Sequence, residues 1–327
     1  MNYIKEREIA VQAVVEAAAL CQQVRSQRVD EAIAKEDKSP VTIADFGAQA
    51  LICRALAAAF PQDPVVGEED SNALTDPAQA AKLAQATEFV QAAVPTATTA
   101  DVIDWIDHGN GAVAQRYWTL DPIDGTKGFL RGDQYAVALA LVEDGDVKVA
   151  VLACPALTLD LGSDQSLGEN SSSGVLLVAL RGQGATCRNL GGGPERKLSV
   201  TRPEDSAHFR FVESVEHGDK ALQQKIAQGI AMTQPAIQMD SQAKYAAVAA
   251  GQAALYLRLP SPKTPDYREK IWDHAAGALI VEEAGGRVTD MHGQPLDFSR
   301  SARLTDNQGV IVSNGTIHDT VLALLNE

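Results

Sequence analysis

The segment Asp121-Pro122-Ile123-Asp124-Gly125-Thr126 constrains the structure of this chain more than any other. It places two carboxylates three residues apart, on a turn bounded by Pro and Gly, directly after the apolar and aromatic run Tyr117 to Leu120. Carboxylates held this close repel each other unless a cation binds between them. Oxygen ligands suit hard divalent ions, Mg²⁺ above all, while Gly125 permits close backbone approach and Thr126 adds a hydroxyl. The segment therefore predicts a strand that leads into a site for metal-assisted phosphate chemistry.

The length of the chain predicts two structural units. A chain of 327 residues exceeds the size at which a single core stops growing. The Gly-rich segment 191–193 suggests the boundary, so we expect an N-terminal α+β unit over 1–195 and a C-terminal α/β unit over 196–327. On this division the first unit carries most of the candidate metal ligands, and the second carries the last one.

Hydrophobic periodicity predicts the main elements. Helical spacing of apolar residues indicates two opening helices, a third helix within a loose segment over 71–115, and a helix near Trp272 that ends before a Gly pair. Alternating runs on either side of Glu143-Asp144-Gly145-Asp146 predict a β-hairpin. The predicted helices span 4–28, 42–60, 76–94 and 272–284, and the hairpin strands span 135–142 and 147–152.

Composition excludes several classes of protein. The net charge of −15 argues against a surface for nucleic acid or anionic membrane, which needs a basic stripe. The chain has no run of eighteen apolar residues, and Met1 to Glu8 lacks the blocks of a signal peptide, so we expect a cytoplasmic protein without membrane contact. The four cysteines lack CxxC spacing, which argues against a zinc site.

Acidic residues recur at the edges of the predicted elements. Asp45 lies in a first helical turn, Glu68 follows a short strand, and Asp273 lies at a helix start. Each has an ordinary explanation alone, because carboxylates stabilise helix N-termini and Asp-Pro is common in turns. Their joint occurrence with the Asp121 to Thr126 segment points to one site, since sites are built at such edges.

Two long motifs resemble the signatures of the inositol monophosphatase superfamily of magnesium-dependent, lithium-sensitive phosphatases. These are Trp118 to Thr126 and Trp272 to Gly277, the second followed by Glu282-Glu283-Ala284-Gly285-Gly286. Within the superfamily the chain is most similar to the 3′(2′),5′-bisphosphate nucleotidases, through the segments 39–45, 126–132, 239–245, 256–260 and 269–272. The resemblance implies an α/β fold of alternating α-β-α-β-α layers.

The resemblance also implies a metal site. Glu68, Asp121 and the carbonyl of Ile123 would bind one Mg²⁺, and Asp121, Asp124 and Asp273 a second, with a third, weaker ion near Glu68. The charge of these acids supports two or three ions, because so many carboxylates would otherwise repel an anionic phosphate.

Two catalytic residues follow from the same resemblance. Asp45 and Thr126 match the pair that orients the attacking water, which would attack phosphorus directly and in line. The backbone amides of Gly125 and Thr126 would donate to the phosphoryl oxygens.

Substrate residues are implied in the second half. Residues that match Asp240, Ser241, Lys244, Arg258 and His217 hold adenosine and the phosphate that is not cleaved in the nucleotidases. Lys244 and Arg258 suit a retained phosphate in an otherwise acidic protein. Lys244 could instead be a solvated helix residue, and Arg258 a strand residue that points outward. The neighbourhood of His217 matches the nucleotidases only loosely, so a role without substrate contact is equally compatible with the sequence. Lys127 and Arg131 flank the acidic segment, where steering of phosphate and a plain surface role are equally compatible with the sequence.

The activity expected from the resemblance is hydrolysis of the 3′-phosphate of adenosine 3′,5′-bisphosphate to AMP, with 3′-phosphoadenylyl sulfate as a further substrate, in sulfur metabolism. The partner would be this small nucleotide alone, bound by a monomer. Two alternatives remain open: an inositol phosphatase that uses the same metals, and a catalytically inactive phosphate-binding protein.

Overall fold

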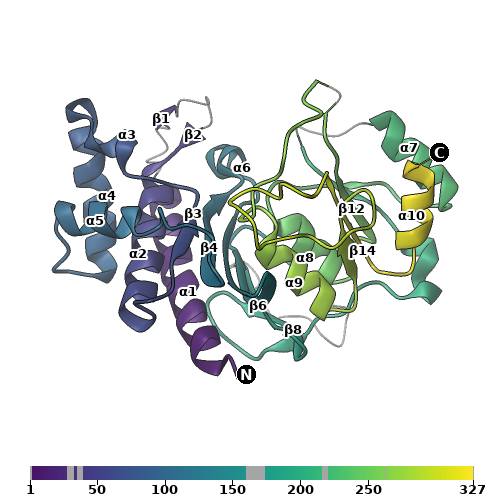
Figure 1. Ribbon diagram of the computed structural model, residues 1–327, viewed down its shortest axis with the longest axis horizontal. Helices are drawn as coiled ribbons and strands as arrows, with labels where there is room; N and C mark the ends of the chain where they lie inside the picture. Colours follow the sequence, from purple (N-terminus) through teal and green to yellow (C-terminus); the bar gives the residue numbers. More distant parts are fainter. Residues whose placement is uncertain are drawn as a thin grey trace.

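A seven-stranded mixed sheet lies at the centre of the molecule (Figure 1), in a computed structural model that describes residues 2–27, 33–34, 40–159, 174–215, 220–261 and 263–326. β3 runs parallel to β4, and every later neighbour in the sheet pairs antiparallel. In spatial order the strands are β3 (Val65–Gly67), β4 (Arg116–Asp124), β5 (Ala136–Glu143), β6 (Asp146–Cys154), β7 (Val175–Leu180), β8 (Gly184–Asn189) and β9 (Arg196–Lys197).

Alternation along β5 divides the interior into two cores, because successive side chains of a strand point to opposite faces. Val137, Leu139 and Leu141 face one core, and Ala136 and Ala138 face the other. The larger side chains pack against α1 (Ile4–Ser26) and α2 (Ile43–Ala59). Further from the sheet, this helical layer continues with α3 (Asn72–Thr75), the 3₁₀ turn η1 (Pro77–Gln79), α4 (Ala80–Ala93) and α5 (Thr99–Asp107). Short strands β1 (Ile33–Ala34) and β2 (Pro40–Val41) pair antiparallel ahead of α2.

The opposite face of the sheet is covered by α8 (Ala243–Ala249) and α9 (Ala275–Glu283). Both helices are rich in alanine, which allows α8 to pack closely on α9 and α9 to approach the alanines of β5. Beyond them lies a three-stranded antiparallel sheet in the order β12 (Leu255–Arg258), β14 (Val310–Ser313), β13 (Arg287–Thr289).

A third core fills the space outside this small sheet. Phe211, Ile226, Ile311 and Val321 lie in it, between β14 and the outer helices α7 (Lys220–Gly229) and α10 (His318–Leu325). The remaining elements are the helix α6 (Thr126–Arg131), the 3₁₀ segment η3 (Pro203–His208) and the parallel pair β10 (Val212–Glu213) and β11 (Ile237–Gln238). The order of layers is α-β-α-β-α, which confirms the predicted fold class.

The structure confirms the opening helices, the hairpin of β5 and β6, and the helix after Trp272. All four cysteines are buried and unpaired. No helix within the described ranges has the length and apolar character needed to cross a bilayer. The division into two units at residue 195 stays a prediction.

Two expectations about local structure are wrong. The predicted helix over 76–94 is confirmed as η1 and α4, but the rest of 71–115 is not a loose segment, because α3 and α5 occupy parts of it as well. A capping box stabilises the start of α5, in which Thr98 and Asp101 bond reciprocally to each other's backbone. β4 does not end at Leu120 either: it continues to Asp124, with a register shift between Asp121 and Asp124. The acidic segment is therefore an irregular strand end rather than a turn.

Candidate active site

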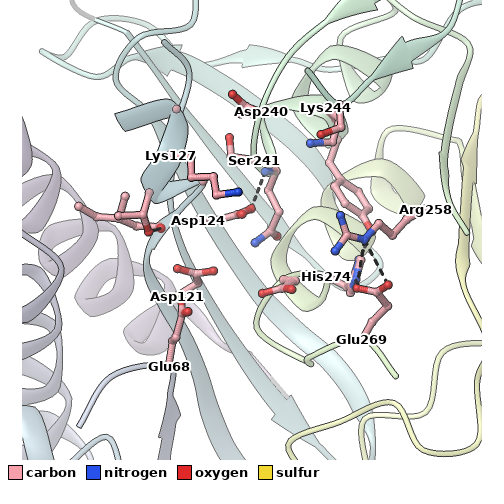
Figure 2. A pocket seen from close by; sticks show the side chains of 18 of the residues that line it. Glu68, Asp121, Asp124, Lys127, Asp240, Ser241, Lys244, Arg258, Glu269 and His274 are labelled. Atoms are coloured by element: carbon pink, nitrogen blue, oxygen red, sulfur yellow. Dashed lines mark hydrogen bonds and ion pairs between the residues drawn. The ribbon is translucent and has the colours of Figure 1, made fainter. Parts of the chain in front are cut away.

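A pocket of about 320 Å³ opens where the end of β4 meets α6, α8 and the start of α9 (Figure 2). Glu68, Asp121 and Asp124 lie on one side of it, and Lys244 and Arg258 lie on the other. Its wall includes most of the residues predicted for the site: Glu68, Asp121, Ile123, Asp124, Gly125, Thr126, Asp240, Ser241, Lys244, Arg258 and Asp273.

The acidic side follows from the pairing of β3 with β4. Gly67 and Leu120 are register partners in these parallel strands, and the amide of Glu68 donates to the carbonyl of Leu120 at 3.1 Å. Glu68 and Asp121 therefore emerge at the same edge of the sheet, as carboxyl ends of parallel strands do. The register shift in β4 then carries Asp124 into the same pocket.

These carboxylates lie in a setting that opposes their charge. Asp121 is almost fully buried, and its Oδ1 has no hydrogen-bond partner among the described residues. Burial first, then the neighbouring Glu68, Asp124 and Asp273, hold the pKa of Asp121 well above its usual range. Burial likewise raises the pKa of Asp273 well above its usual range. Buried like charges and an unpartnered oxygen are what a divalent cation would neutralise, so the residues fit a Mg²⁺ site.

Asp124 is held more firmly than Asp121. Its Oδ2 accepts a hydrogen bond from the backbone amide of Gln242 at 2.5 Å, which fixes it at the centre of the pocket (Figure 2). Burial raises the pKa of Asp124, while the ammonium of Lys244 and this bond act in the opposite direction. The contact joins the end of β4 to the segment before α8.

Asp45 and Thr126 meet at the edge of the pocket. Asp45 is fully buried in the first turn of α2, where its Oδ2 accepts from the amide and the hydroxyl of Thr42 at 2.8 and 2.6 Å. Its other oxygen, Oδ1, accepts a long hydrogen bond of 3.4 Å from the hydroxyl of Thr126. The structure thus brings together the two residues predicted as a pair.

Gly125 and Ser241 require unusual backbone conformations. Gly125 has a φ of +86°, and a Cβ at this position would lie 3.0 Å from Cβ of Ser241. A side chain here would therefore meet both strain and a steric contact. Ser241 itself has a φ of +65°, an uncommon value for a residue other than glycine. Strain of this kind concentrates at functional sites.

The basic side of the pocket holds two cations with different surroundings. Lys244 is buried, with its Nζ 5.2 Å from the ring centroid of Tyr256. Burial lowers the pKa of Lys244 to about 8, against the attraction of Asp124. Arg258 is one-third exposed and forms an ion pair with Glu269 at 3.2 Å. A third cation, Lys127, lines the pocket on the side of Asp124 (Figure 2).

Of the two other residues predicted to bind substrate, Asp240 and His217, the structure places only Asp240. Asp240 lines the pocket, and its Oδ2 forms a short ion pair with the guanidinium of Arg131. Arg131, for which the sequence left two roles open, is therefore a partner of Asp240 across the rim of the pocket. His217 lies outside the described residues.

The wall of the pocket also includes Gln242, Glu269 and His274, for which the sequence predicted no role. Gln242 lines the pocket, and its amide group bonds the carbonyl of Trp272 at 2.9 Å and the amide of Gly277 at 3.0 Å. Glu269 and His274 also line it, and with Asp273 they place potential metal ligands within 4.8 Å of one another. All three lie inside segments that carry the family resemblance, 239–245, 269–272 and 272–277, and this was the signal that could have identified them.

Known proteins resemble this chain over its whole length. The model of the inositol monophosphatase family matches residues 4–327. The chain is 43% identical to a 3′(2′),5′-bisphosphate nucleotidase of Emericella nidulans, with 100% of this chain and 99% of the relative covered. It is 41% identical to a protein of the same name from Schizosaccharomyces pombe, with 98% and 95% covered.

Solved structures share the fold at lower identity. An IMPase from Thermotoga maritima is 22% identical, with a TM-score of 0.65 over 99% of this chain and 97% of the other. CysQ from Bacteroides thetaiotaomicron, described as a bacterial member of the inositol monophosphatase family, is 20% identical, with a TM-score of 0.59 over 95% and 97%.

Proposed function

The chain belongs to the inositol monophosphatase family, and from this premise we propose that it is a Mg²⁺-dependent phosphomonoesterase acting on adenosine 3′,5′-bisphosphate. It removes the 3′-phosphate and releases AMP and inorganic phosphate, and it also accepts 3′-phosphoadenylyl sulfate, in sulfur metabolism. The names of relatives that match over their whole length at 41 to 43% identity support this substrate.

The observation that carries the proposal is the division of the pocket into an acidic and a basic side. A bisphosphate needs cations at two places, one for the phosphate that reacts and one for the phosphate that stays. Lys244 and Arg258 supply the second set, opposite Asp121 and Asp124 (Figure 2). Asp240 and Ser241 line the same pocket and would contact the nucleoside.

The carboxylates would hold two or three Mg²⁺ ions. The side chains of Glu68, Asp121, Asp124 and Asp273, with the carbonyl of Ile123, are the ligands we propose. Bound Mg²⁺ supplies positive charge to the phosphoryl oxygens and makes a nearby water more acidic. Li⁺ should inhibit by competing at this site, in keeping with the lithium sensitivity of the superfamily.

Thr126 and Asp45 would act on the attacking water. The Thr126 hydroxyl lies within hydrogen-bonding distance of two acceptors, Oδ1 of Asp45 at 3.4 Å and the carbonyl of Ile123 at 3.3 Å. With that carbonyl bound to Mg²⁺, the hydroxyl would donate its proton to Asp45, and its oxygen would be free to accept a hydrogen bond from a water molecule. Asp45 can take up the displaced proton, since Thr42 fixes its carboxylate in place. The amides of Gly125 and Thr126 would donate to the phosphoryl oxygens. In-line attack by water predicts inversion at phosphorus.

A substrate panel tests the proposal. The purified protein is assayed for release of phosphate from adenosine 3′,5′-bisphosphate, inositol 1,4-bisphosphate, inositol 1-phosphate and fructose 1,6-bisphosphate, with and without Mg²⁺ and Li⁺. We expect the nucleotide to have the highest kcat/KM, a requirement for Mg²⁺ and inhibition by Li⁺. Equal or better turnover of an inositol phosphate would favour the second candidate, an inositol phosphatase with the same metal ligands.

The setting of the enzyme is part of the proposal. We place it in the cytoplasm as a monomer whose only partner is the small nucleotide. The net charge of −15 supports the absence of nucleic-acid and membrane partners, because it would repel nucleic acid and anionic membrane surfaces.

A further inference from the structure

Arg258 is bound to Glu269 through only one of its side-chain nitrogens. Its Nε donates to both carboxylate oxygens of Glu269, at 3.2 and 3.3 Å. The hydrogen bonds between Arg258 and other described residues all use this nitrogen, so both Nη groups remain available. Figure 2 shows the guanidinium directed into the pocket, with Glu269 beside its Nε. This is the arrangement that a fork needs to bind two oxygens of one phosphate.

Glu269 is in turn fixed by a buried chain of hydrogen bonds. Its Oε2 lies 3.4 Å from Nε2 of His274, and Nδ1 of the same ring lies 2.6 Å from the hydroxyl of Tyr245. Glu269, His274 and Tyr245 are each at most 5% exposed. A neutral Tyr245 that donates to Nδ1 leaves the proton on Nε2, which then donates to Glu269. Each polar group in this series of hydrogen bonds, from Tyr245 through His274 to Glu269, thus has a partner.

The chain is anchored at its far end by close packing. A Cβ on Gly277 would lie only 2.4 Å from Cγ of Tyr245, so α9 contacts the ring where only glycine fits. Tyr245 follows Lys244 on α8. The buried chain therefore connects the two cations of the basic side, one on α8 and one at the end of β12.

The same contacts argue against a metal at Glu269 and His274. Both ring nitrogens of His274 have partners, and the positive guanidinium of Arg258 lies against Glu269. A cation placed there would meet Arg258 and would have to displace Tyr245 or Glu269 from His274. Arg258 already supplies the positive charge that Glu269 requires.

We propose that Glu269, backed by His274 and Tyr245, is a positioning residue that fixes the Arg258 guanidinium to receive the phosphate that is not cleaved. This role deepens the proposed function and rests on it. Without Glu269, Arg258 keeps its charge but gains freedom to rotate, so the retained phosphate loses a preorganised partner. The selectivity of the enzyme for a bisphosphate over a monophosphate should then fall.

The test compares two substrates that differ only in the retained phosphate. The ratio of kcat/KM for adenosine 3′,5′-bisphosphate to that for adenosine 3′-phosphate is measured in the wild type, Glu269→Ala, Arg258→Ala and the double variant. We expect Glu269→Ala to reduce this ratio by roughly tenfold to a hundredfold, the range for a hydrogen bond between charged groups. The loss should appear in KM for the bisphosphate, with kcat within about threefold. In the Arg258→Ala background the Glu269→Ala change should leave the ratio unaltered.

Controls separate positioning from folding and from the proposed function. Glu283→Gln removes the charge of another sheltered carboxylate, which accepts from the amides of Gly182 and Gly184 away from the pocket, and should keep the wild-type ratio. Glu269→Gln preserves side-chain volume and serves if the alanine variant does not fold. It should also reduce the ratio.

Two results would overturn the positioning role. One is a wild-type ratio in both Glu269 variants, and the other is an equal loss of kcat/KM for both substrates. If the wild type itself fails to hydrolyse the bisphosphate, the proposed function is wrong. Titration of the metal-free protein with AMP and adenosine then decides the positioning role separately. Glu269→Ala should weaken AMP binding selectively, and equal binding of AMP by variant and wild type would exclude the role.

Discussion

Replacement of Asp121 by Asn should stabilise the metal-free protein while it removes the response to Mg²⁺. Asp121 is buried, its Oδ1 lacks a partner among the described residues, and the neighbouring Glu68 raises the pKa of its carboxyl group. An amide at this position carries no charge and can donate to Glu68. A buried polar group without a partner costs roughly 1 to 3 kcal/mol. For a chain of 327 residues that corresponds to a rise in Tm of about 1.5 to 4.5 °C without metal.

Thermal unfolding with EDTA and with excess Mg²⁺ measures both effects. At a Mg²⁺ concentration about a hundred times Kd, the wild type should gain about 2.7 kcal/mol, or roughly 4 °C in Tm. Asp121→Asn should lose most of this gain.

Asp290→Asn is the matched control for this experiment. Asp290 is equally buried, but it accepts from the amides of His292 and Gln294, both at 2.9 Å. Its substitution should therefore lower Tm with and without Mg²⁺. A lower Tm of metal-free Asp121→Asn, or a full response of that variant to Mg²⁺, would refute the assignment of Asp121 as a metal ligand.

Three further predictions concern single residues. Thr126→Val should lower kcat by about 10²-fold to 10⁴-fold, the usual contribution of acid-base catalysis, with the Mg²⁺-induced rise in Tm preserved; unaltered kcat would remove Thr126 from the mechanism. Gly277→Ala should destabilise the protein by about 1 to 3 kcal/mol in urea unfolding, because the new methyl group overlaps the ring of Tyr245. Burial lowers the pKa of His318 from 6.5 to about 4, with Arg287 lowering it further and Asp319 opposing. The folded protein then binds fewer protons than the unfolded chain between these values, so the free energy of unfolding should fall by up to about 3 kcal/mol as pH decreases from 6.5 to 4. His318→Gln should flatten this dependence in urea titrations at several pH values, and an equal slope in the variant would contradict the assignment.

The sequence predicts much of the fold because local patterns agree with the tertiary structure. The helical spacing in α1 and α2 and the alternation in β5 and β6 each match one buried face. The missed helix α5 had a local signal, the Thr98 to Asp101 capping box. β4 was predicted too short because Pro122 and two acids interrupt its apolar pattern, whereas the structure accommodates them in a register shift.

The candidate site divides in the same way. Asp121, Asp124 and Asp273 could be predicted because they lie in the two long motifs, and Glu68 because the family resemblance implies it as a further ligand. The ion pair of Arg131 with Asp240 and the chain from Tyr245 to Arg258 could not. Their members lie far apart in sequence, or on different elements, and only the packing of α6, α8, α9 and β12 brings them together. The spacing of residues along the sequence does not predict contacts of this kind.

The identity of the product tests the central claim most directly. ³¹P NMR of adenosine 3′,5′-bisphosphate incubated with enzyme and Mg²⁺ distinguishes which phosphate is released. If the 3′-phosphate lies over Asp121 and Asp124 while Lys244 and Arg258 hold the 5′-phosphate, the products are AMP with its 5′-phosphate intact and inorganic phosphate. Formation of adenosine 3′-phosphate, or no reaction with this nucleotide, would contradict the account.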